Sequence, residues 1–420
     1  MRVWLVHVGE PLPIDSGNER QLRMSLFARM LADRGHDVVW WTSTFDHTHK
    51  RQRAQVDSEI RLEGTLTLRL LYARSYSVNI SLDRLVNHYQ IARAFERLAA
   101  HPAEPAPDVI FATMPTVELA AAAARFGSRR NIPVVVDVRD LHPDIYLSLV
   151  PPAARPMARL ALTPLYRELR TSVTLATGLI AIAPSFLDWA LRHAGRKVTN
   201  RDAVFPLAYP ELPASDEALS AAAVDMEASG VRTDRRIIWY VGTYNRWIDL
   251  GTPILAARIL AERQRDDVQF VFSGSGDFEP EWRRLAGSLP NVVFTGWVDI
   301  PRIVYMRSIA WAGLAPYRPG FLTVGNKLFE YMAGGLPVLL SIGGDARRVI
   351  EEHRCGLPYE GGDPASLVKA IDEMRSDGIR DEMASNSLQA YRDHYAAEKV
   401  YGDMAEFVLD FAARNGDARN

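Results

Sequence analysis

The stretch VGNKLFEYMAGGLPVLLS, residues 324–341, predicts a short helix followed directly by a buried strand. Residues 326–332 have helical spacing, Gly334 and Gly335 supply a left-handed stop, and residues 337–341 form a strand that is almost entirely apolar. Continuous rather than alternating hydrophobicity is typical of strands in a parallel sheet, which is covered on both faces. This unit therefore indicates an α/β fold.

Lys327 and Glu330 stand three positions apart, so they share one face of the predicted helix. An ammonium group beside free backbone N–H groups at a helix N-terminus suits a phosphate. A carboxylate one turn later suits a pair of sugar hydroxyls. The alternative is an exposed ion pair between the two side chains, with no ligand.

The same alternation of apolar runs and amphipathic segments extends over the whole chain and predicts two domains. At 420 residues the chain is too long for one typical core. We expect two doubly wound, Rossmann-like domains facing each other across a cleft, because ligands of such sheets bind at the carboxyl ends of the strands. The predicted parts are a first domain at 1–210, a linker at 211–235, a second domain at 236–395, and a helix at 396–420 that crosses back to the first domain.

The strands of both predicted domains are short apolar runs. In the first domain they are RVWLVHV, DVVWWTS, LRLLYAR, DVIFAT, VVVDVRD and GLIAIAP, and in the second IIWYVG, VQFVFSGSG, NVVFTGWV, AWAGLAPY and PVLLSIG. The longest uncharged run, residues 171–187, is interrupted by Pro184 and falls short of a membrane span, so it is read as helix end, strand and turn. The first residues are read as a strand rather than a signal peptide.

Composition is that of a globular protein, with 48% hydrophobic and 24% charged residues and a net charge of −2. Residues 1–200 hold 25 Lys and Arg against 19 Asp and Glu, and the remainder 24 against 32. A basic first half fits a domain that meets an anionic surface or substrate; uneven solvated faces with no partner fit equally well. The single Cys355 excludes an internal disulfide and suits a reducing cytoplasm. His47 and His49 alone make a weak metal site, so no metal is predicted.

Two loops of the first domain follow predicted strands and carry candidate residues. Asp15, Ser16 and Gly17 open a helix after the first strand, where a loop with glycine can cradle an anion or let a bulky acceptor approach the backbone. An ordinary strand–helix turn is equally consistent with this pattern.

Polar residues are dense after the strand at 134–138, where Arg139, Asp140, His142 and Asp144 follow one another closely. Asp140 or His142 could orient or deprotonate an incoming hydroxyl. The alternative is a structural role, with Asp140 as a helix cap that forms a salt bridge to Arg139.

In the second domain the candidates also follow strands. Gly242 ends the first of them, and Arg246 lies in the next loop, where a guanidinium can bind a diphosphate with two hydrogen bonds. Residues 274–279 lack the complete dinucleotide fingerprint, so NAD binding is rejected. After the strand at 291–296, backbone groups near Val298 could contact the edge of a base.

With these motifs in order, the second domain closely resembles glycosyltransferase family 4, a family of GT-B enzymes. The matching stretches are YVGT, FVFSGSGDF, NVVFTGWV, LAPY, NKLFEYMAGGLPVLLS and CGLPYEGGDPASLVKAI, which together cover about residues 237–371. The first domain matches more loosely, in residues 14–43 and in VDVRDLHPD, and AVFPLAYP stands where such enzymes carry the domain-crossing loop. The sequences VRDLHPD and NKLFEYMAGG are most similar to those of the bacterial branch that builds O-antigen and capsule sugars, which includes amino-deoxyhexose transferases.

The resemblance implies retaining transfer from a nucleotide diphosphate sugar, the co-substrate, without a required metal or other cofactor. It implies that Glu330 holds the ribose hydroxyls, that Lys327 and Arg246 neutralise the diphosphate, and that Val298 meets the base through its backbone. Gly17 would line the junction of donor and acceptor, and Asp140 or His142 would be the acceptor-side catalytic residue. The other residues expected beside these are Gly242, Thr243, Val324, Gly325 and Asn326 for the donor and Asp15, Ser16 and Arg139 for the acceptor.

Two positions depart from the family pattern. Leu322 stands where the family has an acid eight residues before Glu330, and this acid usually touches the donor sugar. Thr243 stands where an arginine commonly follows the first glycine of the second domain, and Arg246 only approximates the lysine that comes soon after. These departures place the identity of the sugar in question and give Lys327 more weight.

We therefore expect a cytoplasmic glycosyltransferase of surface-polysaccharide assembly, acting on a lipid-linked saccharide at the inner face of the membrane. Its expected partners are the nucleotide sugar, the acceptor and, peripherally, anionic lipid, with no nucleic acid. Three alternatives remain open: transfer to a soluble metabolite or natural product, a GT-B subunit that binds nucleotide sugar without transfer, and a GT-B sugar-nucleotide epimerase.

Overall fold

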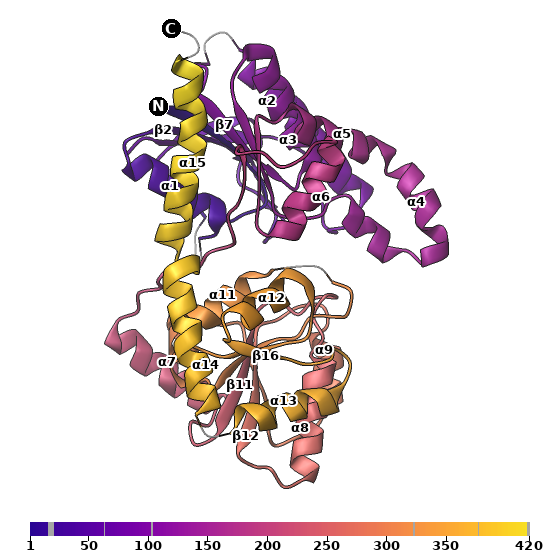
Figure 1. Cartoon of the computed structure of the whole chain (residues 1–420), viewed down its shortest axis with the longest axis vertical. Helices are drawn as coiled ribbons and strands as arrows, with labels where there is room; N and C mark the ends of the chain where they lie inside the picture. Colours follow the sequence, from indigo (N-terminus) through magenta and orange to yellow (C-terminus); the bar gives the residue numbers. More distant parts are fainter. Residues whose placement is uncertain (16–20, 63, 102–103, 322–323, 377, 418–420) are drawn as a thin grey trace. The chain divides into compact units, whose positions relative to one another are not determined.

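The computed structural model describes residues 1–15, 21–62, 64–101, 104–321, 324–376 and 378–417. Its chain divides into two compact units; Figure 1 is coloured along the sequence, so unit 1 has the colours of both chain ends and unit 2 those between them. Unit 1 contains Met1–Pro206 and Val400–Asn420, and unit 2 contains Leu207–Lys399.

Unit 1 is built on an eight-stranded sheet in the order β10-β9-β8-β7-β1-β2-β6-β5. All neighbouring strands are parallel except β5, which pairs antiparallel with β6. A separate hairpin, β3-β4, follows β2. The strands are β1 (Arg2–Val6), β2 (Asp37–Ser43), β3 (Phe45–Asp46), β4 (Arg51–Gln52), β5 (Ser58–Arg61), β6 (Leu66–Leu71), β7 (Val109–Met114), β8 (Val134–Val138), β9 (Gly178–Ala181) and β10 (Asp202–Val204).

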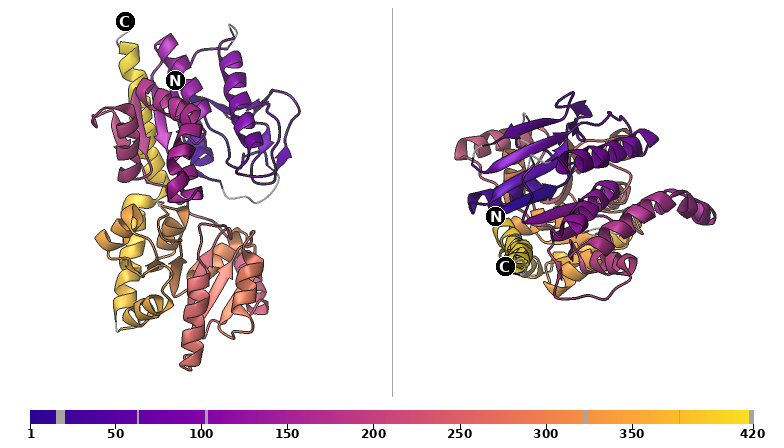
Figure 2. Two further views of the ribbon diagram at one scale, coloured as in Figure 1. Left: turned by 90° about the vertical axis from the view of Figure 1, so that its right-hand side faces the viewer. Right: turned by 90° about the horizontal axis from the view of Figure 1, so that it is seen from above.

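Helices cover both faces of this sheet. On one face Trp4 of β1 packs against Phe95 of α2 and Phe126 of α3, with ring centroids 6.2 and 5.3 Å away. On the other face Phe27 of α1 packs against Phe111 of β7 at 4.9 Å. Figure 2 shows α2 and α3 together on one side of the strands. The helices are α1 (Arg23–Asp33), α2 (Leu82–Ala99), α3 (Val117–Arg130), α4 (Arg155–Ala161), α5 (Thr163–Leu175), α6 (Pro184–Ala194) and α15 (Ala397–Asp417), with short 3₁₀ turns at Asp144–Leu149 and Pro152–Ala154.

The final helix α15 contributes to unit 1 from Val400 onward. The buried guanidinium of Arg23 donates to both carboxylate oxygens of Asp137 at 2.9 and 3.2 Å, and it also contacts Sδ of Met404 at 3.2 Å. The same side chain donates to the carbonyl of Pro206 at 2.9 Å. One ion pair therefore joins α1, strand β8 and the last helix of the chain.

Unit 2 has a six-stranded, fully parallel sheet in the order β13-β12-β11-β14-β15-β16. The strand order reverses between β11 and β14, and at such a reversal α/β sheets bind ligands. The strands are β11 (Arg236–Val241), β12 (Val268–Ser273), β13 (Val292–Gly296), β14 (Ala312–Ala315), β15 (Val338–Leu340) and β16 (Gly356–Pro358). The helices are α7 (Asp216–Ala228), α8 (Gly251–Glu262), α9 (Glu279–Ala286), α10 (Ile300–Ile309), α11 (Asn326–Ala333), α12 (Gly344–Glu352), α13 (Pro364–Met374) and α14 (Ile379–Ala390), and a short π-helical turn spans Tyr391–Tyr395.

The predicted α/β class with two Rossmann-like domains is confirmed, and each predicted strand is found, with ends that differ by up to three residues. Residues 211–235, predicted as a linker with a poor helix, carry α7 and belong to unit 2. Ser215 caps this helix by accepting a hydrogen bond from the N–H of Ala218, and Met226 of the helix is buried. Two buried side chains on a weakly amphipathic helix are too faint a pattern to predict its packing.

Candidate functional site

Glycines line the carboxyl ends of β11, β12 and β13, at positions that no other residue type can occupy without strain. Gly242 and Gly274 have φ values of 141° and 144°. A Cβ at Gly274 would lie 1.9 Å from the carbonyl oxygen of Gly242. The backbone N–H of Gly274 in turn donates to the carbonyl of Gly296 at 2.7 Å. This edge of the sheet is therefore bare backbone, which lets a ligand approach closely.

Lys327 reaches this glycine edge from α11. A Cβ at Gly242 would lie 2.6 Å from its Nζ, so the ammonium group rests directly against the end of β11. Nζ also lies 5.2 Å from the ring centroid of Tyr240, and the hydroxyl of Tyr240 donates to the carbonyl of Thr243 at 2.9 Å. The cation is thus held beside the strand reversal, with an aromatic face beneath it.

Helix α11 begins at Asn326 as predicted, and the left-handed stop is at Gly335, with φ 63°, rather than at Gly334. Glu330 is 4% exposed, so it is not half of a solvated surface ion pair. Val324 is buried, and Gly325 is the N-cap residue in an extended conformation. The free N–H groups of the first helical turn are therefore in the same turn as Lys327. The donor residues predicted on this segment therefore lie together.

The loop after β11 carries two further predicted donor residues. Thr243 and Arg246 are both exposed. The guanidinium of Arg246 lies 5.3 Å from the ring of Trp247, which stacks on Phe321 at 4.7 Å. Arg246 is thus supported by an aromatic pair next to the segment that precedes α11.

After β13, Val298 is 5% exposed, so its side chain is buried and the predicted contact of its backbone with a base stays a prediction. The preceding residue, Trp297, is 72% exposed. An exposed indole at a strand end was not among the predicted residues, although a tryptophan next to a candidate base contact is a visible signal for stacking.

In unit 1, Arg139 is committed to a buried network and does not form a salt bridge to Asp140. Its guanidinium is paired with Glu10, which also accepts from the N–H of Met24 at 2.9 Å. His7 lies 3.3 Å from the same carboxylate. Burial alone would raise the pKa of Glu10, but Arg139 and His7 together hold that pKa well below its usual value. The alternative, a salt bridge between Arg139 and Asp140, is therefore not what the structure has, and Arg139 anchors the loop after β1.

Asp140 and His142 remain available for a ligand at the carboxyl end of β8. One carboxylate oxygen of Asp140 accepts from the N–H of Leu141 at 2.7 Å, and burial raises the pKa of Asp140. His142 is 4% exposed, and neither ring nitrogen has a hydrogen-bond partner among the described residues. Burial, followed by the charge of Arg84, lowers the pKa of His142 to about 4, so the ring is neutral near pH 7.

Next to His142 lies a group of buried polar side chains that the sequence reading did not single out. Nε of Arg84 on α2 donates to Nε2 of His88 at 3.3 Å, and Nδ1 of His88 lies 3.8 Å from the carboxylate of Glu118 on α3. Burial raises the pKa of Glu118 to about 7. Nδ1 of His88, the hydroxyl of Thr116 and one oxygen of Glu118 make no hydrogen bond to other described residues.

Buried polar atoms without partners are costly, so water or a polar ligand is expected to satisfy them. A signal for them was present in the sequence. Glu118 is the sole charged residue in the apolar segment 117–124, and His88 lies one turn after Arg84.

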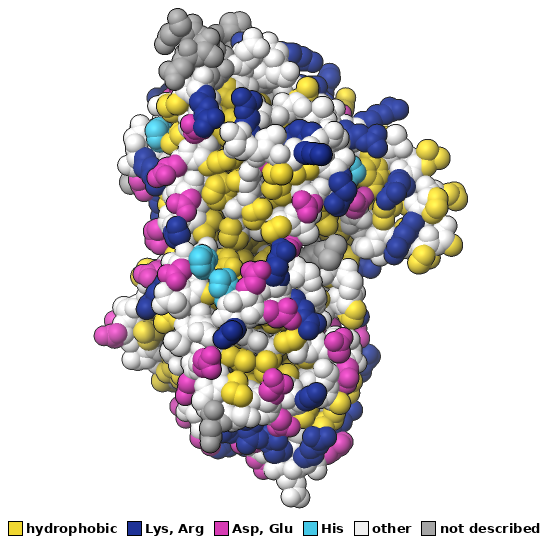
Figure 3. Space-filling view, viewed as in Figure 1, with side chains coloured by type: hydrophobic (Ala, Val, Ile, Leu, Met, Phe, Trp, Pro, Cys, Tyr) yellow, Lys and Arg dark blue, Asp and Glu magenta, His cyan; other side chains and the backbone are white. Residues whose placement is uncertain are grey.

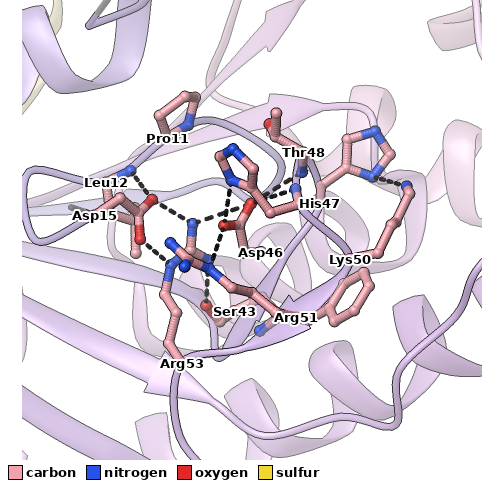
Figure 4. Close-up of polar contacts among 12 residues, drawn as sticks. Pro11, Leu12, Asp15, Ser43, Asp46, His47, Thr48, Lys50, Arg51 and Arg53 are labelled. Carbon is pink, nitrogen blue, oxygen red and sulfur yellow. Dashed lines mark hydrogen bonds and ion pairs between the residues drawn. The ribbon is translucent and has the colours of Figure 1, made fainter. Parts of the chain in front are cut away.

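Asp15 has a structural role, because its side chain is held in an ion pair. Its two carboxylate oxygens each accept from Arg53 at 2.6 Å, and one of them also accepts from the N–H of Leu12 at 2.8 Å (Figure 4). This ion pair fastens the loop after β1 to the β3-β4 hairpin. Ser16 and Gly17 lie outside the described residues, as does Leu322.

Over the described residues, every helix is too short or too polar to cross a bilayer. The same residues contain no group of three His, Cys, Asp or Glu side chains arranged as metal ligands.

Comparison with known families places both units. Residues 21–204 match the Glycosyl transferase 4-like domain, and residues 235–377 match Glycosyl transferases group 1. An uncharacterized glycosyltransferase from Methanocaldococcus jannaschii is 26% identical over 179 residues, which is 41% of this chain and 44% of that protein. The phosphatidyl-myo-inositol mannosyltransferase of Mycobacterium leprae is 33% identical over 129 residues, or 30% and 34% of the two chains. The chain thus spans less than half the length of these curated relatives.

Similar solved structures extend over the whole chain at low sequence identity. Sucrose-phosphate synthase from Thermosynechococcus elongatus superposes with a TM-score of 0.73, 18% identity, and coverage of 98% of this chain and 99% of the other. HepE from Anabaena in complex with UDP gives 0.64, 16% identity, and 98% and 100%. WaaG, a glycosyltransferase involved in lipopolysaccharide biosynthesis, gives 0.64, 15% identity, and 97% and 99%.

The two matched domains together span most of the chain, and the neighbours share their two-domain architecture. The chain therefore belongs to the GT-B glycosyltransferases, joining a 4-like first domain to a group 1 second domain.

Proposed function

We propose that the protein is a retaining glycosyltransferase that moves a hexosyl unit from a nucleotide diphosphate sugar to a hydroxyl of a lipid-linked saccharide. The pathway would be surface polysaccharide or lipopolysaccharide biosynthesis, at the cytoplasmic face of the inner membrane. The observation that carries the transfer chemistry is Lys327 held against Gly242 at the strand reversal of unit 2.

In unit 2 the nucleotide sugar would lie along the glycine edge. Glu330 would hold the ribose hydroxyls, Lys327 and Arg246 the diphosphate, and backbone groups near Val298 the base. HepE was solved with UDP, which supports a nucleotide ligand for this domain type. The exposed ring of Trp297 would stack on the base.

Loss of the nucleoside diphosphate develops negative charge on the outer phosphate. A fixed ammonium and helix N–H groups stabilise that charge more in the transition state than in the ground state. These cations would replace a metal ion, so a chelator should leave the rate unchanged. We propose same-face attack, in which the leaving phosphate oxygen accepts the proton of the acceptor hydroxyl. A product with inverted anomeric configuration would contradict this mechanism.

In unit 1 the acceptor would bind at the buried polar group around His142, with Asp140 orienting the reacting hydroxyl. The phosphatidyl-myo-inositol mannosyltransferase and the lipopolysaccharide enzyme WaaG support a lipid-linked acceptor by their names. The name of sucrose-phosphate synthase favours the alternative, a soluble acceptor.

Thermal shifts against UDP-, GDP- and dTDP-sugars test the donor site. A ligand that binds only the folded state raises the melting temperature, so the correct donor should stabilise the protein. Lys327→Ala and Glu330→Ala should abolish this shift, whereas the exposed controls Lys369→Ala and Glu351→Ala should retain it. A shift that survives both site substitutions would exclude this donor site.

A further inference from the structure

Exposed hydrophobic side chains are concentrated in unit 1. Among the described residues it has twelve of the fourteen large hydrophobic side chains that are strongly exposed, and unit 2 has two. The face of unit 1 drawn in Figure 3 has hydrophobic side chains lying among Lys and Arg. Six of the twelve occur within residues 72–89: Tyr72, Val78, Ile80, Leu82, Val86 and Tyr89. We call these six side chains the apolar rim.

The apolar rim combines one loop with the outer side of α2. Leu82, Val86 and Tyr89 have the spacing i, i+4, i+7 and therefore lie along one side of the helix. The opposite side packs inward through Ile91 and Phe95, which are buried. Figures 1 and 2 both show α2 at the periphery of unit 1. A helix that is apolar on its outer side as well indicates an interaction surface.

Two cations from neighbouring elements, Lys50 of the β3-β4 hairpin and Arg84 of α2, lie against Tyr76 of the same loop. Nζ of Lys50 lies 4.8 Å and the guanidinium carbon of Arg84 5.9 Å from the ring centroid of Tyr76. Asn79 holds both side chains: its side-chain oxygen accepts from Lys50, and its carbonyl accepts from Arg84 at 2.8 Å. The two cations are close enough that Arg84, after burial, lowers the pKa of Lys50.

Neither cation forms an ion pair with a carboxylate of the described residues. Asp46, the acidic residue in the same hairpin, is paired with His49 at 2.9 Å and Arg51 at 3.3 Å. Figure 4 shows Lys50 reaching toward His47, on the side of the hairpin away from the Asp46 carboxylate. Asp46 is near enough to raise the pKa of Lys50, and Arg84 is near enough to lower those of Glu118 and Asp140. Two adjacent cations that make no direct ion pair nevertheless favour a site for an anion.

A second, independent observation is the unsatisfied imidazole of His142. It is buried, lacks a hydrogen-bond partner among the described residues, and is close enough to Arg84 for that charge to lower its pKa. The surface therefore grades from exposed hydrocarbon through two adjacent cations to a group of buried polar side chains. This order matches the parts of a lipid at a membrane surface: hydrocarbon, phosphate and polar headgroup.

We propose that the apolar rim docks on a membrane that contains anionic phospholipid, with the lipid phosphate bound by Lys50 and Arg84. That the lipid-borne group is also the sugar acceptor rests on the proposed function, whereas docking itself does not. The mode is an amphipathic helix lying in the interface, because its exposed apolar residues are flanked by basic ones.

Binding of the full chain to vesicles tests docking without donor or acceptor. The wild type should bind vesicles of phosphatidylglycerol mixed with phosphatidylcholine, less at high salt, and should bind pure phosphatidylcholine weakly. The triple variant Leu82→Gln, Val86→Gln, Tyr89→Gln should lose binding to both, while Val198→Gln, an exposed hydrophobic elsewhere in unit 1, should not.

The double variant Lys50→Gln, Arg84→Gln should lose only the preference for anionic vesicles, roughly tenfold or more, since each cation at the surface favours anionic lipid. Arg29→Gln, at an exposed arginine on α1, is the matched control.

Equal wild-type binding to both vesicles, or full binding by the triple variant, would overturn the proposal. A triple variant that has a smaller mass than the wild type by light scattering, but binds vesicles equally well, would also overturn the proposal. The rim would then be the contact with a second copy of this chain. Retention of the donor-induced thermal shift shows that each variant is folded. If the wild type shows no shift with any donor, that result counts against the proposed function and not against docking.

Discussion

The ammonium of Lys327 lies so close to Gly242 that a Cβ at that glycine would be 2.6 Å from Nζ. A lysine on α11 and a glycine that ends β11 are thus mutually dependent, although 84 residues separate them. Any side chain at position 242 would move the cation that we propose neutralises the diphosphate.

Gly242→Ala should therefore reduce donor binding and turnover nearly as much as Lys327→Ala. The loss expected from displacing one charge-stabilising donor is roughly a hundred- to a thousandfold in kcat. Initial rates with saturating donor measure it. Gly343→Ala is the control, because a Cβ there meets nothing within 4 Å. Normal turnover by Gly242→Ala would show that Lys327 acts from another position.

Asp140→Asn should impair transfer while leaving the donor-induced thermal shift intact, because Asp140 belongs to unit 1 and the donor residues to unit 2. Removal of a group that orients or deprotonates a hydroxyl typically costs about 10²–10⁴ in rate. Since burial raises the pKa of Asp140, wild-type activity should fall on mild acidification as the carboxylate becomes protonated. The same acid limb in Asp140→Asn would assign it to another group.

Glu118 should make stability depend on pH. Its pKa is raised from 4.5 to about 7, so between these values the folded state binds a proton that the unfolded state has lost. Stability therefore falls as pH rises through this window, by up to about 3 kcal/mol for a shift of this size. Glu118→Gln should remove this fall, as urea unfolding near pH 5 and near pH 8 would measure. The exposed Glu281→Gln should behave as the wild type.

Breaking the ion pair between Asp15 and Arg53 should loosen the loop after β1. Both side chains are less than 10% exposed, and removing one partner of a buried pair typically costs about 3–5 kcal/mol. Asp15→Asn should lower the free energy of unfolding, and Arg53→Met in the same chain should recover part of the loss. Additive losses in the double variant would argue against direct coupling.

The sequence allowed the fold to be predicted because its strands are continuous apolar runs such as residues 237–241, which can only be buried. The turn of Lys327 and Glu330 was also predictable, since helical spacing alone puts both residues on one face. The grouping of His142 with His88 and Glu118 in unit 1 was not predictable, although His142 itself was a predicted site residue. His88, Glu118 and His142 come from three segments whose proximity depends on tertiary packing, and local patterns carry no information about it.

The division of unit 1 between the two ends of the chain has a consequence for biosynthesis. Residues 207–399 are contiguous, so unit 2 can close as soon as they have emerged from the ribosome. Unit 1 begins first but cannot be completed until α15 has been made, because Sδ of Met404 contacts the Arg23 guanidinium that pairs with Asp137. The second domain should therefore acquire protease resistance before the first in ribosome-bound chains of increasing length. The order of folding would then be the reverse of the order of translation.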